Sequence, residues 1–206
     1  MLLWVGFLLI SAGLACLAID RQAVHFFHAA ISRSFDRMLH ATTDWAKGSL
    51  WLTAAALALV VAHAVEWARG PSPDMDELGR VSLAFLVSLA AASVVLHSIK
   101  LVVGRRRPRD ELDLDLYGFR PFTWDLRNDS FPSGHALTIF CVAVVTSAVA
   151  PEWAPVCFVG AAWLALTRAL VNSHYLSDVF VGAGIALIVT REMLLLFFPD
   201  VTQPWF

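Results

Sequence analysis

Residues 81–107 read VSLAFLVSLAAASVVLHSIKLVVGRRR, an apolar run that ends abruptly in a cluster of basic residues. No Lys, Arg, Asp or Glu occurs from Val81 to Ile99. A helix of about 20 such residues is long enough to cross the roughly 30 Å hydrocarbon core of a bilayer. The run therefore predicts a transmembrane helix whose end is marked by Lys100 and the arginines that follow it.

Five further charge-poor stretches of similar length accompany this one. They cover residues 2–19, 48–65, 136–150, about 156–170 and 174–191. The composition agrees, because 58% of the 206 residues are hydrophobic and only 16% are charged, against roughly a quarter charged in soluble proteins. We therefore expect an all-α fold, a polytopic membrane bundle with six transmembrane helices in which residues 1–206 form a single domain. The net charge of −2 argues against nucleic acid as a partner.

The segment between the first two predicted spans, residues 20–47, is amphipathic rather than apolar. Its hydrophobic residues recur at helical spacing, and arginines, serines and an aspartate lie between them. This pattern is typical of a helix that lies in the membrane interface with its apolar face toward the acyl chains. We expect one such interfacial helix after the first span.

The order of the spans predicts where the polar residues gather. The third span ends near Lys100 and the fourth begins near His135, so both ends lie on the same side of the membrane. The fifth span returns the chain to that side, where Arg168, His174 and Asp178 occur. Ionisable residues at membrane depth are costly and usually functional. Three polar clusters are therefore expected to converge on one face.

The first cluster consists of Lys100, Arg107 and Pro108. Seven residues are nearly two helical turns, which would bring the two cations toward one side, although Pro108 disfavours helical geometry at Arg107 and is expected to end the helix there. Two cations at a helix end indicate an anion-binding site. A juxtamembrane basic patch that attracts acidic lipid headgroups explains this cluster equally well when it is taken alone.

The second cluster, Pro132 to His135, immediately precedes the fourth span. Gly134 lets the backbone approach a ligand closely, and the free N–H groups of the first helical turn can bind phosphate. His135 is then placed to donate a proton. The simpler interpretation of this segment alone is an ordinary helix entry capped by Ser133.

The third cluster combines Arg168, His174 and Asp178. His174 and Asp178 are four residues apart, so on one helix face the carboxylate would accept the Nδ1 proton and leave Nε2 free as a nucleophile. Arg168 lies six residues before His174, and a break at Asn172 and Ser173 would let both face one site. For an isolated pair, a His–Asp hydrogen bond between two helices is the simpler explanation.

Taken in order, Lys-x6-Arg-Pro, Pro-Ser-Gly-His and Arg-x5-His-x3-Asp resemble the three-part signature of the type 2 phosphatidic acid phosphatase superfamily. The resemblance covers Lys100 to Asp178 directly. The six-span plan is similar to that of the bacterial integral-membrane members over nearly the whole chain. Thr167 is one departure, because the family more often has Ser before the arginine, although a hydroxyl is retained.

The resemblance implies that a lipid phosphate is hydrolysed through a phosphohistidine intermediate. The residues that would bind the phosphate oxygens are Lys100, Arg107, Ser133, Gly134 and Arg168. His174 would attack phosphorus, Asp178 would orient its imidazole, and His135 would protonate the leaving group and then activate water. Three cations can neutralise the charge that a metal neutralises elsewhere, and the site has no carboxylates at metal-ligand spacing, so we expect no metal and no other cofactor.

The substrate stays open among phosphatidylglycerol phosphate, phosphatidic acid, undecaprenyl diphosphate and lipid A phosphate. The expected partners are this membrane lipid phosphate and the bilayer, with no obligate protein partner. One alternative is a lipid phosphotransferase that uses the same site. The other is a non-catalytic membrane protein that binds or transports an anion or a lipid, although such a protein has no use for a nucleophilic His–Asp pair.

Two indicators of membrane orientation disagree. Outside the signature, the cations on the side of the site are Arg21, Arg33, Arg37 and Lys47, and those on the other side are Arg69, Arg80 and Arg191. By the positive-inside rule, this small excess favours a cytoplasmic site. The family resemblance instead implies a bacterial inner-membrane protein with its active site on the periplasmic, outer face. We follow the resemblance because the margin in charge is small.

Overall fold

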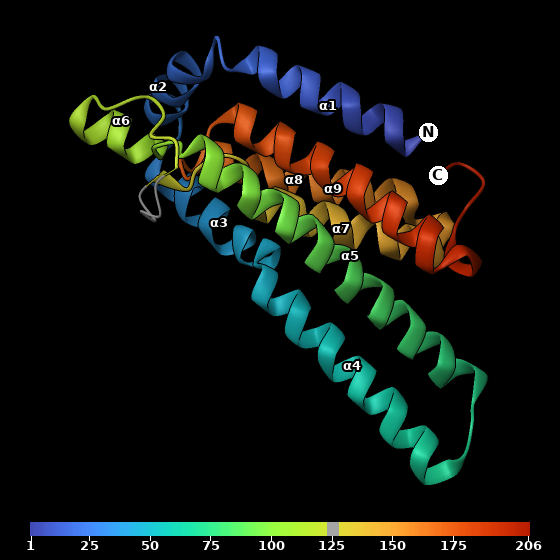
Figure 1. The fold of residues 1–206 in the computed structure, drawn as a ribbon. Coiled ribbons are helices and arrows are strands. Elements are labelled where there is room, and N and C mark those ends of the chain that lie inside the picture. Colours follow the sequence, from blue (N-terminus) through green and yellow to red (C-terminus); the bar gives the residue numbers. More distant parts are fainter. Residues whose placement is uncertain (123–127) are drawn as a thin grey trace.

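The computed structural model describes residues 1–122 and 128–206, and helices dominate that part of the chain (Figure 1). Six apolar helices lie where the sequence predicts them. They are α1 (Leu2–Cys16), α4 (Gly48–Arg69), α5 (Pro73–Val103), α7 (Gly134–Val149), α8 (Ala154–Leu170) and α9 (Leu176–Phe197). The prediction of an all-α membrane bundle is therefore confirmed.

Length and hydropathy identify the membrane spans within the described ranges. Four helical segments qualify by themselves, namely residues 33–69, which include α4, then α5, residues 151–170 around α8, and α9. A fifth results when α1 is joined to α2 (Asp20–Ala30) across a bend of 83°. α7 is apolar but has only 16 residues. The chain is a multi-pass membrane protein, and the count of six spans stays a prediction.

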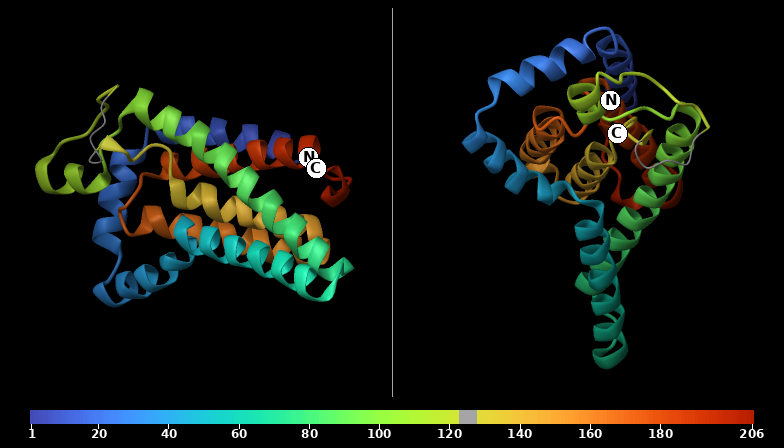
Figure 2. Two further views of the ribbon diagram at one scale, coloured as in Figure 1. Left: turned by 60° about the horizontal axis from the view of Figure 1, so that its bottom comes forward. Right: turned by 90° about the vertical axis from the view of Figure 1, so that its left-hand side faces the viewer.

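The amphipathic segment forms two helices where the sequence analysis expected one. α2 ends at Ala30, and α3 (Arg33–Thr43) begins after Ile31, whose backbone is extended. Ser32 caps α3 by accepting a hydrogen bond from the Phe35 N–H at 3.3 Å. A serine that satisfies a free N–H in this way favours a new helix start over continuation of the old helix. Both helices cross one end of the bundle (Figure 2).

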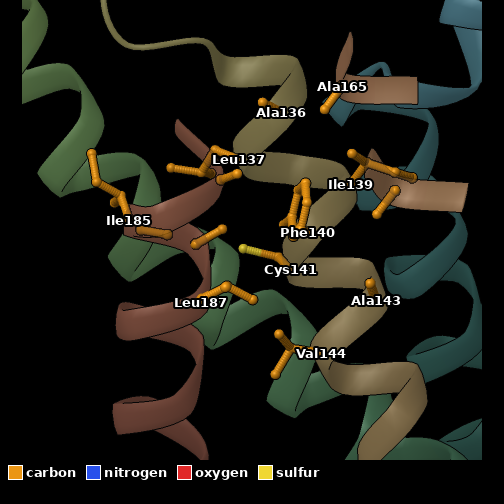
Figure 3. Close-up of a cluster of buried hydrophobic side chains, with 14 of the residues drawn as sticks. Ala136, Leu137, Ile139, Phe140, Cys141, Ala143, Val144, Ala165, Ile185 and Leu187 are labelled. Atoms are coloured by element: carbon orange, nitrogen blue, oxygen red, sulfur yellow. The ribbon is translucent and has the colours of Figure 1, made fainter. Parts of the chain in front are cut away.

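α9 is the central helix of the bundle. It packs against α1, α5, α7 and α8, so its apolar residues are buried on several sides. Figure 3 shows the contact between α7 and α9, where Leu137, Cys141 and Val144 lie near Leu187. A helix that is buried on several sides provides a rigid support for the polar residues at its N-terminal end.

Glycines let α9 approach two of its neighbours at backbone distance. A Cβ on Gly184 would lie 2.7 Å from the carbonyl oxygen of Gly6 in α1. On the other side, a Cβ on Gly182 would overlap the carbonyl oxygen of Ser133 and lie 3.3 Å from its backbone nitrogen. The Ser133 N–H also donates to the Asp178 carbonyl oxygen at 2.9 Å. The entry to α7 is therefore held directly against the first turns of α9.

Gly182→Ala should destabilise the protein by about 1–3 kcal/mol, because the added methyl group collides with backbone that cannot rotate away. Gly160→Ala is the matched control, since Gly160 lies within α8 and no atom approaches its Cβ position within 4 Å. That change should be neutral or stabilise the helix by about 0.5–1 kcal/mol. Thermal unfolding in detergent measures both. Equal melting temperatures for the two variants would contradict the close contact at Ser133.

Candidate active site

The polar clusters meet where four helix ends converge. These are the C-terminal ends of α5 and α8 and the N-terminal ends of α7 and α9, on the side of the bundle that carries α2 and α6 (Pro108–Leu114) (Figure 1). The rings of His135 and His174 lie with their centroids 6.5 Å apart. The loop after α5 lies beside them, because Ser130 contacts His174. The order of the spans thus correctly predicts which clusters meet.

The helix is interrupted between Arg168 and His174, as the sequence predicts. α8 ends at Leu170, and Asn172 adopts a left-handed conformation with a φ of 52°. The carbonyl oxygen of Arg168 accepts hydrogen bonds from the N–H groups of Ser173 and His174, at 3.0 and 3.1 Å. This turn brings His174 back over the end of α8 that carries Arg168.

The imidazole of His174 is oriented by a backbone carbonyl. Its Nδ1 lies 2.8 Å from the carbonyl oxygen of Ser130 and 3.6 Å from Oδ2 of Asp178. A carbonyl oxygen only accepts hydrogen bonds, so this contact requires the proton on Nδ1 and leaves the lone pair on Nε2. This is the tautomer that the sequence analysis expected, with Nε2 unprotonated, but the acceptor at hydrogen-bond distance is Ser130 rather than Asp178.

His174 lies outside α9, which corrects the expectation that it shares a helix face with Asp178. Tyr175 is the N-cap residue of α9, and Asp178 accepts a hydrogen bond from the Tyr175 N–H at 2.9 Å. The four-residue spacing here reflects a capped helix start and not one turn of helix. Asp178 therefore acts on the imidazole as a nearby charge and also anchors the N-terminus of α9.

Burial keeps the His174 imidazole uncharged. The residue is 3% exposed, and this burial lowers the pKa of His174 below its usual value, against the opposing effect of Asp178. The positive charges of Lys100 and Arg107 lower that pKa further. A neutral imidazole with a free Nε2 is the form that can act as a nucleophile near neutral pH.

A fully buried arginine that the sequence analysis did not single out supports Asp178. The guanidinium of Arg105 donates to Oδ1 of Asp178 at 2.5 Å and to Oδ2 of Asp20 at 2.8 Å. It also donates to the hydroxyls of Ser177 and Tyr117, and it lies 3.9 Å from the centre of the Tyr175 ring. Arg105 therefore joins the loop after α5 to α2 and to α9.

Both carboxylates in this cluster depend on Arg105. Asp20 and Asp178 have fully buried side chains, and Ser130 donates a further hydrogen bond to Asp178 at 2.5 Å. Burial alone would lower the pKa of Arg105, but Asp178 and Asp20 outweigh it and raise that pKa above the usual value. The guanidinium is therefore a permanent charge that holds Asp178 ionised and in place.

The cations of the first cluster share one carboxylate. Arg107 binds Oδ1 of Asp129 through Nε at 2.8 Å and through Nη2 at 2.7 Å. Lys100 donates to the Asp129 carbonyl oxygen and lies 3.9 Å from Oδ2. Lys100 and Arg107 do converge, but not on one helix as the spacing predicts, because α5 ends at Val103 and Arg107 is the N-cap residue of α6. They meet through Asp129 instead.

Arg168 approaches the site from α8. Its Nη1 donates to the hydroxyl of Thr43 at 3.1 Å, and Thr167 also contacts that hydroxyl, at 3.0 Å. Its Nε is buried and has no hydrogen-bond partner among the described residues. Thr43 and Thr167 therefore position a guanidinium that still has a free donor.

Ser133 and Gly134 form the start of α7. The Ser133 hydroxyl accepts from the Ala136 N–H at 3.4 Å, which is the ordinary capping role. Gly134 is the first helical residue, and no described atom outside its own helical turn and its chain neighbours lies within 4 Å of its Cβ position. Within residues 1–122 and 128–206, no group of three His, Cys, Asp or Glu residues is arranged to hold a metal ion.

The residues that the sequence analysis missed share one property, which is that their partners are distant in the chain. Asp20, Arg105, Asp129 and Ser130 all lie in or beside segments of mixed polarity. The one local signal was Asp20, an acidic residue at the end of the first apolar run. No feature of the neighbouring sequence distinguishes Arg105 from the two arginines that follow it.

Comparison with known families agrees with this geometry. A family model described as the PAP2 superfamily matches residues 82–201, which is more than half of the chain and includes all three clusters. The chain belongs to the PAP2 superfamily. The resemblance to the type 2 phosphatidic acid phosphatases is thereby confirmed.

Relatives within the PAP2 superfamily include two proteins named lipid A 1-phosphatase. The one from Rhizobium etli is 33% identical over 100 residues, which are 48% of this chain and 43% of the relative. The one from Rhizobium johnstonii is 32% identical over 91 residues, which are 44% of this chain and 37% of the relative. The chain thus spans less than half the length of these relatives.

A solved PAP2-type structure has the same fold. It is a transmembrane phosphatidylglycerolphosphate phosphatase from Bacillus subtilis, which matches with a TM-score of 0.67 over 100% of this chain and 97% of its own. The sequences are 17% identical, so the likeness establishes the fold of the chain and not its substrate.

Proposed function

We propose that this PAP2 protein is a membrane-embedded phosphatase that removes the phosphate or diphosphate group of a lipid through a phosphohistidine at His174. The observation that carries the proposal is the buried imidazole of His174, whose Nδ1 is hydrogen-bonded to a carbonyl so that Nε2 is free beside Lys100 and Arg107. The names of the relatives and of the structural neighbour support a lipid phosphate as substrate. In this proposal residues 1–206 act as one catalytic domain.

The first chemical step transfers the phosphoryl group to the protein. Nε2 of His174 attacks phosphorus, an N–P bond forms, and the P–O bond to the leaving group breaks. Lys100, Arg107 and Arg168 neutralise the phosphate oxygens, with Ser133 and the Gly134 amide completing the anion site. Asp178, held by Arg105, stabilises the positive charge that develops on the imidazole.

The second step hydrolyses the phosphohistidine and regenerates free His174. His135 gives its proton to the leaving oxygen in the first step and accepts a proton from water in the second. The water oxygen attacks phosphorus, the N–P bond breaks, and inorganic phosphate leaves. The rings of His135 and His174 are neighbours, with centroids 6.5 Å apart, which is consistent with both imidazoles acting on one bound phosphate.

Phosphate release from purified protein in detergent tests this function directly. The substrates are phosphatidic acid, phosphatidylglycerol phosphate, undecaprenyl diphosphate and lipid A phosphate, each in excess EDTA. We expect release from at least one of them without added metal. Activity that disappears in EDTA and returns only with Mg²⁺ would contradict the mechanism. Phosphate that appears on an added acceptor lipid would instead identify a phosphotransferase.

Asp129→Asn should strengthen inhibition by inorganic phosphate, because a carboxylate that competes for Lys100 and Arg107 is removed. Losing one competing charge-assisted contact corresponds to roughly a tenfold lower inhibition constant. Asp110→Asn is the control, since Asp110 pairs with Arg106 at 3.8 Å and should leave inhibition unchanged. Weaker inhibition in the Asp129 variant would mean that Asp129 orders these cations for phosphate.

We further propose that the site faces the periplasm of a bacterial inner membrane. The charge count that opposes this orientation includes Arg21, whose charge is already paired with Glu111 at 2.7 Å and Asp115 at 2.8 Å. A single cysteine at the exposed position of Asp113, with Cys16, Cys141 and Cys157 replaced, should react with an impermeant thiol reagent on intact spheroplasts. Reaction only after membrane disruption would place the site in the cytoplasm.

A further inference from the structure

Two adjoining cavities extend from the site toward the amphipathic helices. The smaller, of ≈250 Å³, is lined by Arg107 and Ser173, which neighbour the proposed phosphate site and His174. The larger, of ≈790 Å³, lies between α2, α3 and the end of α8. His40, Arg109 and Asn172 line both cavities. Because they share these walls, we name the two cavities together the headgroup groove.

The headgroup groove carries an excess of positive charge. Arg33, Arg37 and Arg109 line it and are exposed, and their guanidinium groups have no partner within the part of the chain that the structure describes. Among the described residues that line it, the one carboxylate is Asp36, which lies 3.7 Å from His40. By contrast Arg21 and Arg80, also in amphipathic or juxtamembrane segments, are paired with carboxylates. Unpaired guanidinium groups in a cavity suit an anion with several acceptor oxygens.

A polar group at the junction of the two cavities also lacks a partner. The side-chain oxygen of Asn172 is buried and accepts no hydrogen bond from the described residues. Asn172 lies in the left-handed turn that positions His174, so its amide joins the headgroup groove to the site. An amide can donate to and accept from a headgroup that carries both hydroxyls and phosphate oxygens.

We infer that the headgroup groove binds a second phosphate group of the same lipid substrate, so that the preferred substrate carries two phosphate groups. The inference rests on the proposed function and names its substrate class. The cations that line the groove are distinct from Lys100 and Arg168, and among the described cations only Arg107 borders both places. A volume of ≈790 Å³ exceeds what a single phosphate needs and is in the range of small-molecule sites.

Comparing two substrates with the same acyl chains measures the contribution of this second phosphate to kcat/KM. Both phosphatidic acid and phosphatidylglycerol phosphate end in a phosphate monoester, and the latter also contains a phosphodiester. In an uncharged detergent, wild-type kcat/KM should be at least about tenfold higher for phosphatidylglycerol phosphate, since hydrogen bonds to charged groups are the strong ones. Arg33→Gln with Arg37→Gln should bring this ratio close to one, mainly through KM. Arg69→Gln, which removes an exposed charge at the far end of α4, should keep the ratio.

Further measurements distinguish whether the anion in the groove belongs to the substrate, to free phosphate or to a bilayer lipid. If the double variant weakens inhibition by inorganic phosphate while the substrate ratio is unchanged, the groove binds free phosphate and the inference is wrong. If it loses activity on both substrates equally, and only in vesicles containing an anionic lipid, the groove binds bilayer lipid and the inference is also wrong. Should the double variant not fold, Arg109→Gln on α6 repeats the test. A wild type that hydrolyses no lipid phosphate overturns the proposed function, whereas hydrolysis of both lipids without preference overturns the groove alone.

Discussion

His174→Ala should reduce phosphate release to the background rate, a loss in kcat on the order of 10⁴-fold or more. Nε2 of His174 is the atom that forms the bond to phosphorus, and an alanine has nothing to replace it. Steady-state phosphate release at saturating lipid substrate measures the loss. His63→Ala is the matched control, because His63 is an exposed imidazole of α4 that pairs with Glu66 away from the site. Loss of less than tenfold in the His174 variant would remove His174 from the mechanism.

His135→Ala should behave differently from His174→Ala when the leaving group is changed. With an alkyl phosphate the expected loss is about 10²–10⁴-fold, the usual contribution of a general acid. With an activated aryl phosphate, whose leaving group needs no proton, the first step should recover much of its rate. If the His174 variant recovers with the aryl substrate and the His135 variant does not, the two roles are exchanged.

Arg105→Met should cause the largest loss of stability among the polar residues of the site. The change leaves the carboxylates of Asp20 and Asp178 buried without their cation, and breaking a buried pair in this way costs about 3–5 kcal/mol. For a chain of this length the melting temperature in detergent should fall by roughly 10 °C. Activity should fall as well, because Asp178 loses the contact that positions it near His174.

Two comparisons make the Arg105 prediction specific. Arg106→Met removes the neighbouring charge, which pairs with Asp110 at 3.8 Å, and should cost less than about 1 kcal/mol. Adding Asp20→Asn to Arg105→Met removes one of the two unpaired charges and should recover part of the lost stability. Equal melting temperatures for the Arg105 and Arg106 variants, or no recovery in the double variant, would contradict the buried network.

The helices were predictable from the sequence because the bilayer imposes a simple rule. A helix that crosses hydrocarbon must be apolar along about 20 residues, and such runs are visible without any tertiary information. The order of the spans then determined that Lys100, His135 and His174 meet, because each span reverses the side of the membrane. The prediction of one helix over residues 20–47 was wrong. The spacing of apolar residues is the same on both sides of Ser32, so it does not reveal that Ser32 caps the start of a second helix.

The supporting contacts of the site were not predictable in the same way. Spacing along the chain placed Asp178 next to His174, but the carbonyl of Ser130, which is 44 residues away, occupies the hydrogen-bonding position. The pairing of Arg105 with Asp20 joins residues 85 positions apart and depends on how α2 lies against α9. Such contacts depend on packing between segments, and local periodicity carries no information about them.

The central claim is that the phosphoryl group passes through His174, and rapid-quench labelling tests it most directly. Wild-type protein mixed in EDTA with a lipid substrate labelled in the scissile phosphate should show acid-labile, alkali-stable label on the protein within one turnover, as a phosphohistidine does. The same label should accumulate in His135→Ala with an aryl phosphate, because the water step is then slow, and should be absent from His174→Ala. Label that persists in His174→Ala, or that never forms in wild-type protein that is turning over, would contradict the mechanism.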